Sequence, residues 1–157
     1  MTNAPLAIRP AHPNDLAAIV EFNTRLAQET EHKFLDSETL TTGVRAALAS
    51  PDRLRYWVAE RAGHVVGQAA ITREWSDWRN GWIWWFQSVY VRAEQRGTGV
   101  FRSLYEHIEQ SARASGDVIG LRLYVEDQNH AALATYAALG MQPGGYRVLE
   151  KFWIPLG

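Results

Sequence analysis

The chain has 157 residues, no cysteine and a formal net charge of −1, from 16 lysines and arginines against 17 aspartates and glutamates. This composition excludes disulfides, thiolate metal sites and cysteine nucleophiles, and it lacks the basic excess typical of proteins that bind a nucleic-acid backbone. Since the sequence also shows neither a secretory signal nor an apolar run of the ~18 residues that a membrane helix requires, we expect a soluble cytoplasmic domain with no nucleic-acid or membrane partner.

The N-terminal third of the sequence predicts a short strand followed by two helices. Residues 6–9 alternate in polarity, as in a strand. Asn14 or Asp15 can cap a first helix, because the apolar residues that follow recur at helical spacing. A second helix begins at Ser37, a good capping residue, and runs towards Pro51.

The centre of the sequence predicts three strands joined by tight turns. Two apolar runs, residues 56–60 and 65–71, flank a short segment that contains glycine, which is typical of a hairpin. A second turn ends in Asn80-Gly81 and leads into residues 82–91. The β-branched and aromatic side chains of that run favour a central strand covered on both faces.

The C-terminal part predicts two helices and two strands. Apolar residues spaced by four from Val100 onwards predict a helix that ends at Gly116. Residues 119–125 form the next strand, which should run parallel to the previous one because a full helix separates them. Asn129 can cap a last helix, and residues 146–153 close the sheet as a final strand. The order β-α-α-β-β-β-α-β-α-β indicates a mixed sheet and the α/β or α+β class.

Two closely spaced glycines, Gly97 and Gly99, lie between the long strand and the helix that follows it. Glycines let the backbone turn tightly and approach a ligand without a Cβ in the way. A helix start presents unpaired N–H groups and the positive end of the helix dipole, which suits a phosphate ester. Arg96 adds a planar set of donors for the same anion. The alternative is that both glycines serve only the turn.

Residues 96–101 resemble the acetyl-CoA-binding motif of the GNAT superfamily of N-acetyltransferases, which reads Arg/Gln-x-x-Gly-x-Gly/Ala after a central strand. The arginine and the second glycine match, whereas Phe101 stands where the family has a small residue. Residues 129–141 are similar to a second family motif, Asn-x-x-Ala-x-x-x-Tyr-x-x-x-Gly-Phe. The resemblance covers nearly the whole chain. It implies a single N-acetyltransferase domain over residues 1–157, with helices flanking a mostly antiparallel sheet that contains one parallel, splayed strand pair.

The resemblance also implies acetyl-CoA as co-substrate, and the five scattered histidines give no spacing that suggests a metal. The pantetheine arm would lie along residues 89–91, where a backbone amide can stabilise the oxyanion. Tyr136 matches the family position that protonates the leaving thiolate; the alternative is that it only packs, with its hydroxyl bonded to Asn129. The implied cofactor-binding residues are Val89, Tyr90, Val91, Arg96, Gly97, Thr98, Gly99, Val100, Phe101, Arg102, Asn129 and Tyr136.

Five of the seven tryptophans lie between Trp75 and Trp85, where they either fill a core or form a wall beside a ligand. As a wall they would stack on a cationic amine, and Arg79 would suit a carboxylate on the same molecule. We therefore predict a small, amino-acid-like primary amine as the acceptor. The candidate acceptor residues are Trp78, Arg79, Trp85 and Gln87.

The sequence leaves the general base open, because no carboxylate occurs between Asp77 and Glu94. A water held by Gln87 or a backbone carbonyl could take the proton, as could the carboxylate of Glu74, Asp77 or Glu150. Three functions are consistent with the sequence: an N-acetyltransferase that acts on a small or a protein amine, a domain that senses acyl-CoA without turnover, and an interaction domain that dimerises through its tryptophans. Homodimers are common in the GNAT superfamily, so the resemblance also allows one.

Overall fold

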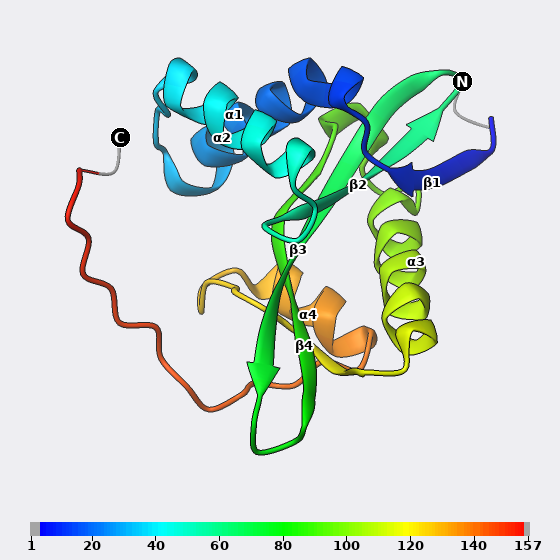
Figure 1. Cartoon of the computed structure of the whole chain (residues 1–157). Coiled ribbons are helices and arrows are strands. Elements are labelled where there is room, and N and C mark those ends of the chain that lie inside the picture. Colours follow the sequence, from blue (N-terminus) through cyan, green and yellow to red (C-terminus); the bar gives the residue numbers. More distant parts are fainter. Residues whose placement is uncertain (1–3, 156–157) are drawn as a thin grey trace. The chain divides into compact units, whose positions relative to one another are not determined.

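A five-stranded mixed sheet organises the first of the two units into which the chain divides, Met1–Leu123 and Tyr124–Gly157. The computed structural model describes residues 4–155. The strands follow one another in space in their chain order (Figure 1). They are β1 (Leu6–Pro10), β2 (Arg55–Arg61), β3 (His64–Ser76), β4 (Gly81–Val91) and β5 (Val118–Leu123).

The direction of each strand follows from the connection before it. Tight turns join β2 to β3 and β3 to β4, and both pairs are antiparallel, as is the pair of β1 and β2. The helix α3 (Val100–Ser115) separates β4 from β5, and these two strands are parallel. The predicted mixed, mostly antiparallel sheet with one parallel pair is therefore confirmed. Strand β3 continues five residues beyond the predicted end at residue 71, because β4 pairs with it up to Ser76.

Helices cover both faces of this sheet. Helices α1 (Leu16–Glu31) and α2 (Ser37–Ala49) lie on one face, where Ala70 of β3 packs in a cluster with Ile19 and Val44. Helix α3 lies on the other face, where the ring of Tyr105 stacks on Phe86 of β4 with centroids 5.3 Å apart. Two 3-10 turns, η1 (Pro13–Asp15) and η2 (Ala93–Gln95), precede α1 and the glycine loop.

The predicted N-cap residue is confirmed at α1 and wrong at α2. Asp15 is the N-cap residue of α1, as one of the two predicted candidates. The cap of α2 is Asp36 and not Ser37, because the Asp36 carboxylate accepts a hydrogen bond from the backbone N–H of Thr39 at 2.9 Å. A carboxylate at this position also interacts favourably with the helix dipole.

The tryptophan cluster divides between the core and the surface. Trp84 is buried and its ring lies 6.0 Å from that of Trp57, so this part of the cluster fills the core. Trp75 contacts Trp82 edge-on at 5.0 Å but is about half exposed, and Trp78 at the turn is 84% exposed. The core interpretation is therefore confirmed for Trp84, and a ligand wall formed by the exposed tryptophans stays a prediction.

The second unit contains the helix α4 (His130–Ala138), capped as predicted by Asn129, whose side-chain oxygen accepts from the Ala132 N–H at 3.1 Å. The predicted strand over residues 146–153 is wrong, since the described residues after α4, up to residue 155, form no strand. Tyr146, Leu149 and Trp153 are each at least 80% exposed. Alternation of side chains makes a strand only where another strand supplies the backbone hydrogen bonds, and none pairs with this segment.

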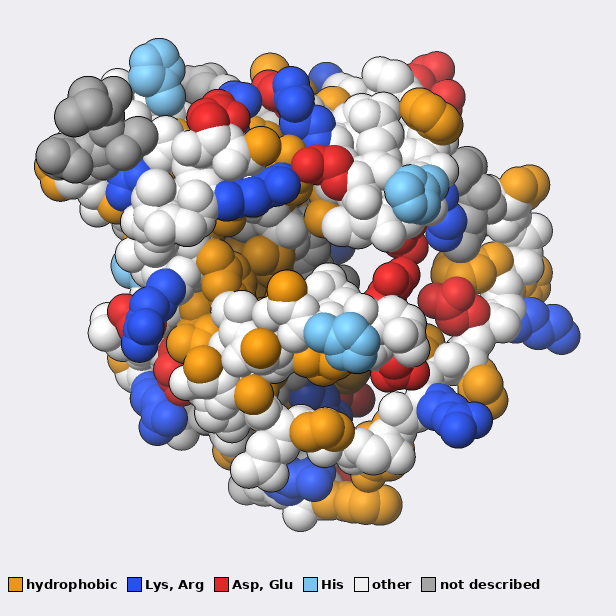
Figure 2. All heavy atoms as spheres, turned by 180° about the vertical axis from the view of Figure 1, so that it is seen from behind, with side chains coloured by type: hydrophobic (Ala, Val, Ile, Leu, Met, Phe, Trp, Pro, Cys, Tyr) orange, Lys and Arg blue, Asp and Glu red, His pale blue; other side chains and the backbone are white. Residues whose placement is uncertain are grey.

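Charged side chains of both signs are interspersed on the face of the molecule seen in Figure 2, and no basic stripe crosses that face. Within residues 4–155, no helix is both long and apolar enough to cross a membrane.

Candidate active site

The two halves of β4 differ in how they are paired. Residues from Trp82 to Phe86 pair with β3 on one side and with β5 on the other. Strand β5 ends at Leu123 opposite Phe86, so the rest of β4 has no strand on that side among the described residues. This half of β4 therefore presents an open backbone edge.

A β-bulge lies in the open half of β4. Gln87 pairs with Ala70 and Tyr90 with Gln68, so Ser88 and Val89 together oppose one residue of β3. Ser88 has a φ of +51°, a left-handed backbone conformation that is strained for a residue other than glycine. Bulges of this kind redirect a strand and are common beside active sites.

The glycine loop lies at the N-terminus of α3. Gly97 and Gly99 have φ values of +78° and +87°, which explains why glycine stands at both positions. A Cβ built at either glycine would meet no other atom within 4 Å, so the space in front of the loop is open. The first helical hydrogen bond runs from the Ser103 N–H to the Gly99 carbonyl, which leaves the amides of Val100 and Arg102 without an acceptor inside the helix. The loop thus has the backbone geometry of a phosphate site.

Side chains from β2 and η2 hold this loop in place. Arg61 of β2 donates to the Gln95 side-chain oxygen at 2.7 Å and to the Thr98 hydroxyl at 3.1 Å. The Thr98 hydroxyl in turn donates to the Gln95 carbonyl at 2.6 Å. Because these hydrogen bonds hold the loop in one conformation, its amides need little reorganisation to bind an anion.

Arg96 contacts α1 and β4. Its guanidinium forms an ion pair with Glu29 of α1 at 3.1 Å, donates to the Val91 carbonyl at 3.0 Å and lies over the Tyr90 ring. A hydrogen bond from Tyr90, together with Arg96, lowers the pKa of Glu29, although burial opposes this shift. Burial and the bond to Glu29 raise the pKa of Tyr90. Arg96 therefore ties the loop to α1, and a contact of its guanidinium with phosphate stays a prediction.

Phe101 and Arg102 lie in the first turn of α3. The Phe101 ring lies 6.1 Å from that of Tyr105, one turn further along the helix. Arg102 donates to Glu106 at 2.9 Å, a surface pair within the helix. The bulky side chain at the family's small-residue position thus packs along α3.

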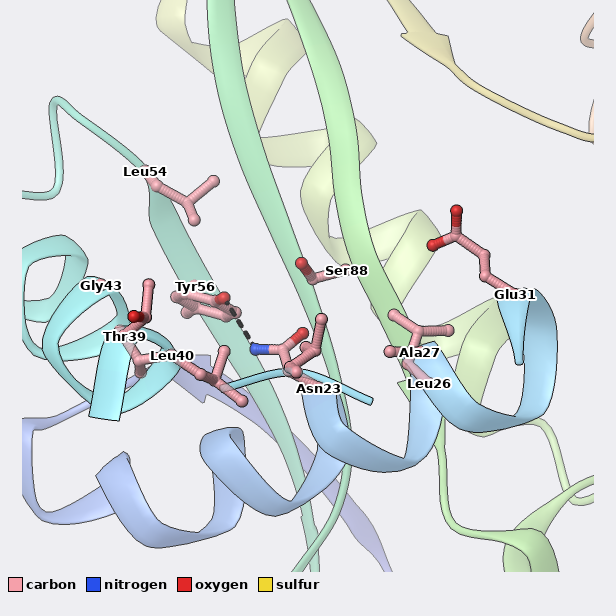
Figure 3. A pocket seen from close by; sticks show the side chains of 12 residues that line it. Asn23, Leu26, Ala27, Glu31, Thr39, Leu40, Gly43, Leu54, Tyr56 and Ser88 are labelled. Carbon is pink, nitrogen blue, oxygen red and sulfur yellow. Dashed lines mark hydrogen bonds between the residues drawn. The ribbon is translucent and has the colours of Figure 1, made fainter. Parts of the chain in front are cut away.

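A cavity of about 400 Å³ opens on the α1 and α2 face of the sheet (Figure 3). Its size is within the range of small-molecule sites. Leu26 and Leu40 form part of an apolar lining, and Glu31 lies across the cavity from Leu40 (Figure 3). Ser88 also lines the cavity, so the cavity reaches the bulge in β4.

A chain of hydrogen bonds connects the cavity with the bulge. Asn23 of α1 donates to the Tyr56 hydroxyl at 3.1 Å, and both residues line the cavity. Gln68, which is fully buried, donates to the Asn23 side-chain oxygen at 3.3 Å and to the Ser88 carbonyl at 2.9 Å. These polar groups link α1, β2, β3 and β4.

The family model described as "Acetyltransferase (GNAT) family" matches residues 18–141, which include the bulge, the glycine loop and α4. The chain belongs to this family. A crystal structure of a possible acetyltransferase from Clostridium difficile 630 is 43% identical and has a TM-score of 0.88, over 96% of this chain and 99% of that one. A predicted acetyltransferase from Clostridium acetobutylicum, solved with acetyl-CoA, has the same fold at 19% identity, with a TM-score of 0.72 over 93% and 96% of the two chains.

A curated relative comes from Bacillus subtilis (strain 168) and is described as a candidate [ribosomal protein bS18]-alanine N-acetyltransferase. It is 29% identical over 92 residues, which are 59% of this chain. The match spans only 56% of that relative's own length.

The four residues predicted to bind the acceptor do not line the cavity. Trp78 and Arg79 lie in the turn between β3 and β4, where Arg79 contacts the Ser76 hydroxyl. The Trp85 indole N–H donates to Glu74 at 3.0 Å, and Gln87 donates to the Thr72 hydroxyl at 3.3 Å. Their role in acceptor binding stays a prediction.

In the second unit, Tyr136 lies in α4 and Asn129 is the N-cap residue of that helix. Burial raises the pKa of Tyr136, so its phenol keeps its proton at neutral pH. Asn129 caps the helix through its bond to the Ala132 N–H. The role of Tyr136 as a proton donor stays a prediction.

The candidate bases that the sequence offered are engaged elsewhere or exposed. Glu74 accepts hydrogen bonds from Trp85 and from Arg122 at 2.7 Å, and neither Asp77 nor Glu150 lines the cavity. Glu31 does line it, and sequence reasoning missed this residue. Within residues 4–155, no group of three or more potential metal ligands comes together.

Sequence reasoning also missed Asn23 and Tyr56. A signal for Asn23 existed, because it is a buried polar residue directly after Phe22 in the apolar stripe of α1. Gln68 gives a similar signal, since it interrupts the apolar run of β3. Buried polar side chains in an apolar pattern need partners, and here the partners are one another.

Proposed function

We propose that the chain transfers an acetyl group from acetyl-CoA to the primary amine of a small, amino-acid-like acceptor that binds in the cavity. One observation carries the proposal: Ser88 lines the cavity, and the next three residues of β4 are the predicted binding segment for the pantetheine arm. An amine in the cavity and a thioester along Val89–Val91 would therefore approach each other at the bulge.

Each group of the proposed site has a separate task. The amides of the glycine loop bind the diphosphate, and an amide of residues 89–91 stabilises the negative charge that develops on the thioester oxygen. Among the described residues that line the cavity, Glu31 carries the one carboxylate, and we assign to it attraction of the ammonium group, whose proton then leaves to water. Tyr136 returns a proton to the thiolate as the carbon–sulfur bond breaks.

We propose further that residues 1–157 act as one catalytic domain in the cytoplasm. The family match over residues 18–141 includes parts of both units, which supports a shared function. We also propose a homodimer, supported by the apolar side chains that residues 146–154 expose. Sedimentation velocity tests this, and a monomer at high protein concentration contradicts it.

Two other functions each have one observation in their favour. The partial match to the Bacillus subtilis relative favours a protein N-terminal amine as acceptor. Phe101 in the cofactor motif, with no carboxylate on β4, favours a domain that binds acyl-CoA without turnover.

An amine panel that includes amino-acid amides, simple alkylamines and short peptides distinguishes these functions. The assay follows release of free CoA thiol from acetyl-CoA, with denatured protein as the control. We expect turnover with a small amine, while turnover with peptides alone supports the protein-amine alternative. If no amine reacts but CoA raises the Tm, the chain is a sensor, because a ligand that binds only the folded state stabilises it.

A further inference from the structure

One end of the hydrogen-bond chain beneath the cavity is a backbone carbonyl, which fixes the direction of every bond in the chain. The Ser88 carbonyl can only accept, so the Gln68 nitrogen, 2.9 Å away, must face it. The same nitrogen lies 3.3 Å from the Asn23 oxygen. The Asn23 nitrogen therefore faces Tyr56 and donates to its hydroxyl oxygen at 3.1 Å.

The reverse orientation of these amides is disfavoured. A flipped Gln68 would place its oxygen against the Ser88 carbonyl oxygen, and two acceptors repel each other. The orientation in the structure leaves the Gln68 Oε1 buried without a partner among the described residues. Leaving such an acceptor unpaired is costly, so the bulge carbonyl determines the direction of the chain even at that cost.

As a consequence, the Tyr56 hydroxyl group can act as a hydrogen-bond donor. The Tyr56 oxygen accepts a hydrogen bond from Asn23, and no acceptor for the Tyr56 hydroxyl proton is found among the described residues. Tyr56 lines the cavity but is only 5% exposed, so packing holds its ring in place. The phenolic O–H is therefore available to a molecule bound in the cavity.

The other lining residues restrict what that molecule can be. Glu31 is acidic, and no lysine, arginine or histidine of the described residues lines the cavity. Glu31 forms an ion pair with Lys33 at 3.5 Å, so a free carboxylate on the acceptor would meet no cation in the lining and, beside Glu31, only a cation that is already paired. Leu26 and Leu40 suit an apolar side chain.

We infer that the acceptor is an amine that also carries an uncharged carbonyl oxygen, the chemistry of amino-acid amides and of peptide N-termini, and that Tyr56 selects it by donating to that oxygen. This inference rests on the proposed function and adds the substrate class. Tyr56 is a specificity-determining residue that touches the acceptor. Asn23 and Gln68 are positioning residues that act through Tyr56.

The test compares three acceptors that differ in one group: leucinamide, isopentylamine, which lacks the carboxamide, and leucine, which has a free carboxylate. For the parent protein we expect kcat/KM to be about ten-fold higher for leucinamide than for isopentylamine, and leucine to be the poorest acceptor. In Tyr56→Phe the ratio of the two amines falls to near one, through a higher KM for leucinamide and with an unchanged KM for acetyl-CoA.

Two further variants separate this role from a structural one. Tyr105→Phe removes another buried hydroxyl, on α3, and keeps the ten-fold ratio. Asn23→Leu removes the bond that orients Tyr56, so it lowers the ratio while the protein still turns over isopentylamine. A Leu-Gly-Gly peptide distinguishes the two sources of the same chemistry: it is a better acceptor than leucinamide only if the site serves peptide N-termini.

The outcomes that overturn the inference are an unchanged ratio in folded Tyr56→Phe and a preference of the parent protein for isopentylamine or leucine. If no acceptor is acetylated, the proposed function fails for this class, and binding decides the inference separately. Calorimetry with CoA present then compares leucinamide binding to the parent protein and to Tyr56→Phe. Binding that Tyr56→Phe loses supports the inference, whereas no binding to the parent protein overturns it.

Discussion

The glycine loop and the cavity differ in what they present to a ligand. The loop offers backbone amides at the start of one helix, after Arg96, whose own N–H already donates to the Ala93 carbonyl at 3.3 Å. The cavity offers side chains from α1, α2, β2 and β4, which lie between Asn23 and Ser88 in the sequence. A backbone site requires glycine at particular φ values and leaves a motif, whereas a side-chain site built by four elements leaves none.

The two regions meet at the bulge of β4. Ser88 lines the cavity and its carbonyl holds Gln68, and the residues after it lead along the open edge of the strand towards the loop. Binding of the co-substrate and of the acceptor should therefore respond to different substitutions, except at this bulge. The following substitutions test that separation.

The largest effect should come from a residue that lies in neither the glycine loop nor the cavity lining. Tyr136→Phe should lower kcat about 10²–10⁴-fold, the usual contribution of a general acid, with little change in either KM. Steady-state kinetics on the folded variant measures this. Tyr146→Phe, an exposed tyrosine of the same unit, is the matched control. An unchanged kcat in Tyr136→Phe would mean that the phenol only packs.

Gly99→Val should damage the loop and spare the cavity. Valine is strained at a φ of +87°, at a cost of about 1–3 kcal/mol, and its side chain occupies the open space in front of the loop. We expect acetyl-CoA to bind about 10–100-fold more weakly, as measured by calorimetry. Gly116→Val, with a φ of +82° at the other end of α3, introduces similar strain as a control. Equal binding by both variants would contradict the assignment of the loop.

A substitution at Ser88 should affect both regions at once. Ser88→Val strains the left-handed position further and disturbs the bulge, so we expect about a 5–10-fold increase in both KM values. Ser88→Gly accepts the same φ of +51° and should keep both KM values close to those of the parent. A change in only one KM in Ser88→Val would show that the bulge serves a single substrate.

Glu31→Gln should weaken acceptor binding alone. Glu31 is exposed at the edge of the cavity, where water and salt screen its charge, so we expect only about a 2–5-fold higher KM for the amine. The difference from the parent should shrink as ionic strength rises. Glu109→Gln on α3 serves as a control that removes a charge elsewhere. A loss in kcat with an unchanged KM would instead assign proton removal to Glu31 without a binding role.

The smallest effect is expected at the turn between β3 and β4. If the acceptor binds in the cavity, Trp78→Ala leaves both KM values within about two-fold of the parent, because this exposed side chain has little effect on the fold. The sequence-based hypothesis expects the opposite, a higher KM for the amine alone. Kinetics with the best acceptor of the panel decides between the cavity and the turn.

Sequence reasoning succeeded where neighbouring residues carry the information. The helix after the glycine loop, the cap at Asn129 and the parallel strand after α3 all follow from local spacing and from one connection rule. The strand at residues 146–153 failed because alternation does not reveal whether a pairing strand exists. Glu31 and Tyr56 were missed because the helices and strands that bring them together are far apart in the chain.

The sequence by itself determined the family, the order of strands and helices as far as α4, and the loop proposed to bind the cofactor, because periodicity, caps and glycines act over a few residues. Only the tertiary structure decided the position of the cavity and the direction of its hydrogen bonds. It also separated Trp84, in the core, from Trp78, on the surface. These properties depend on which side chains pack against one another across the sheet, and no pattern of neighbouring residues encodes that.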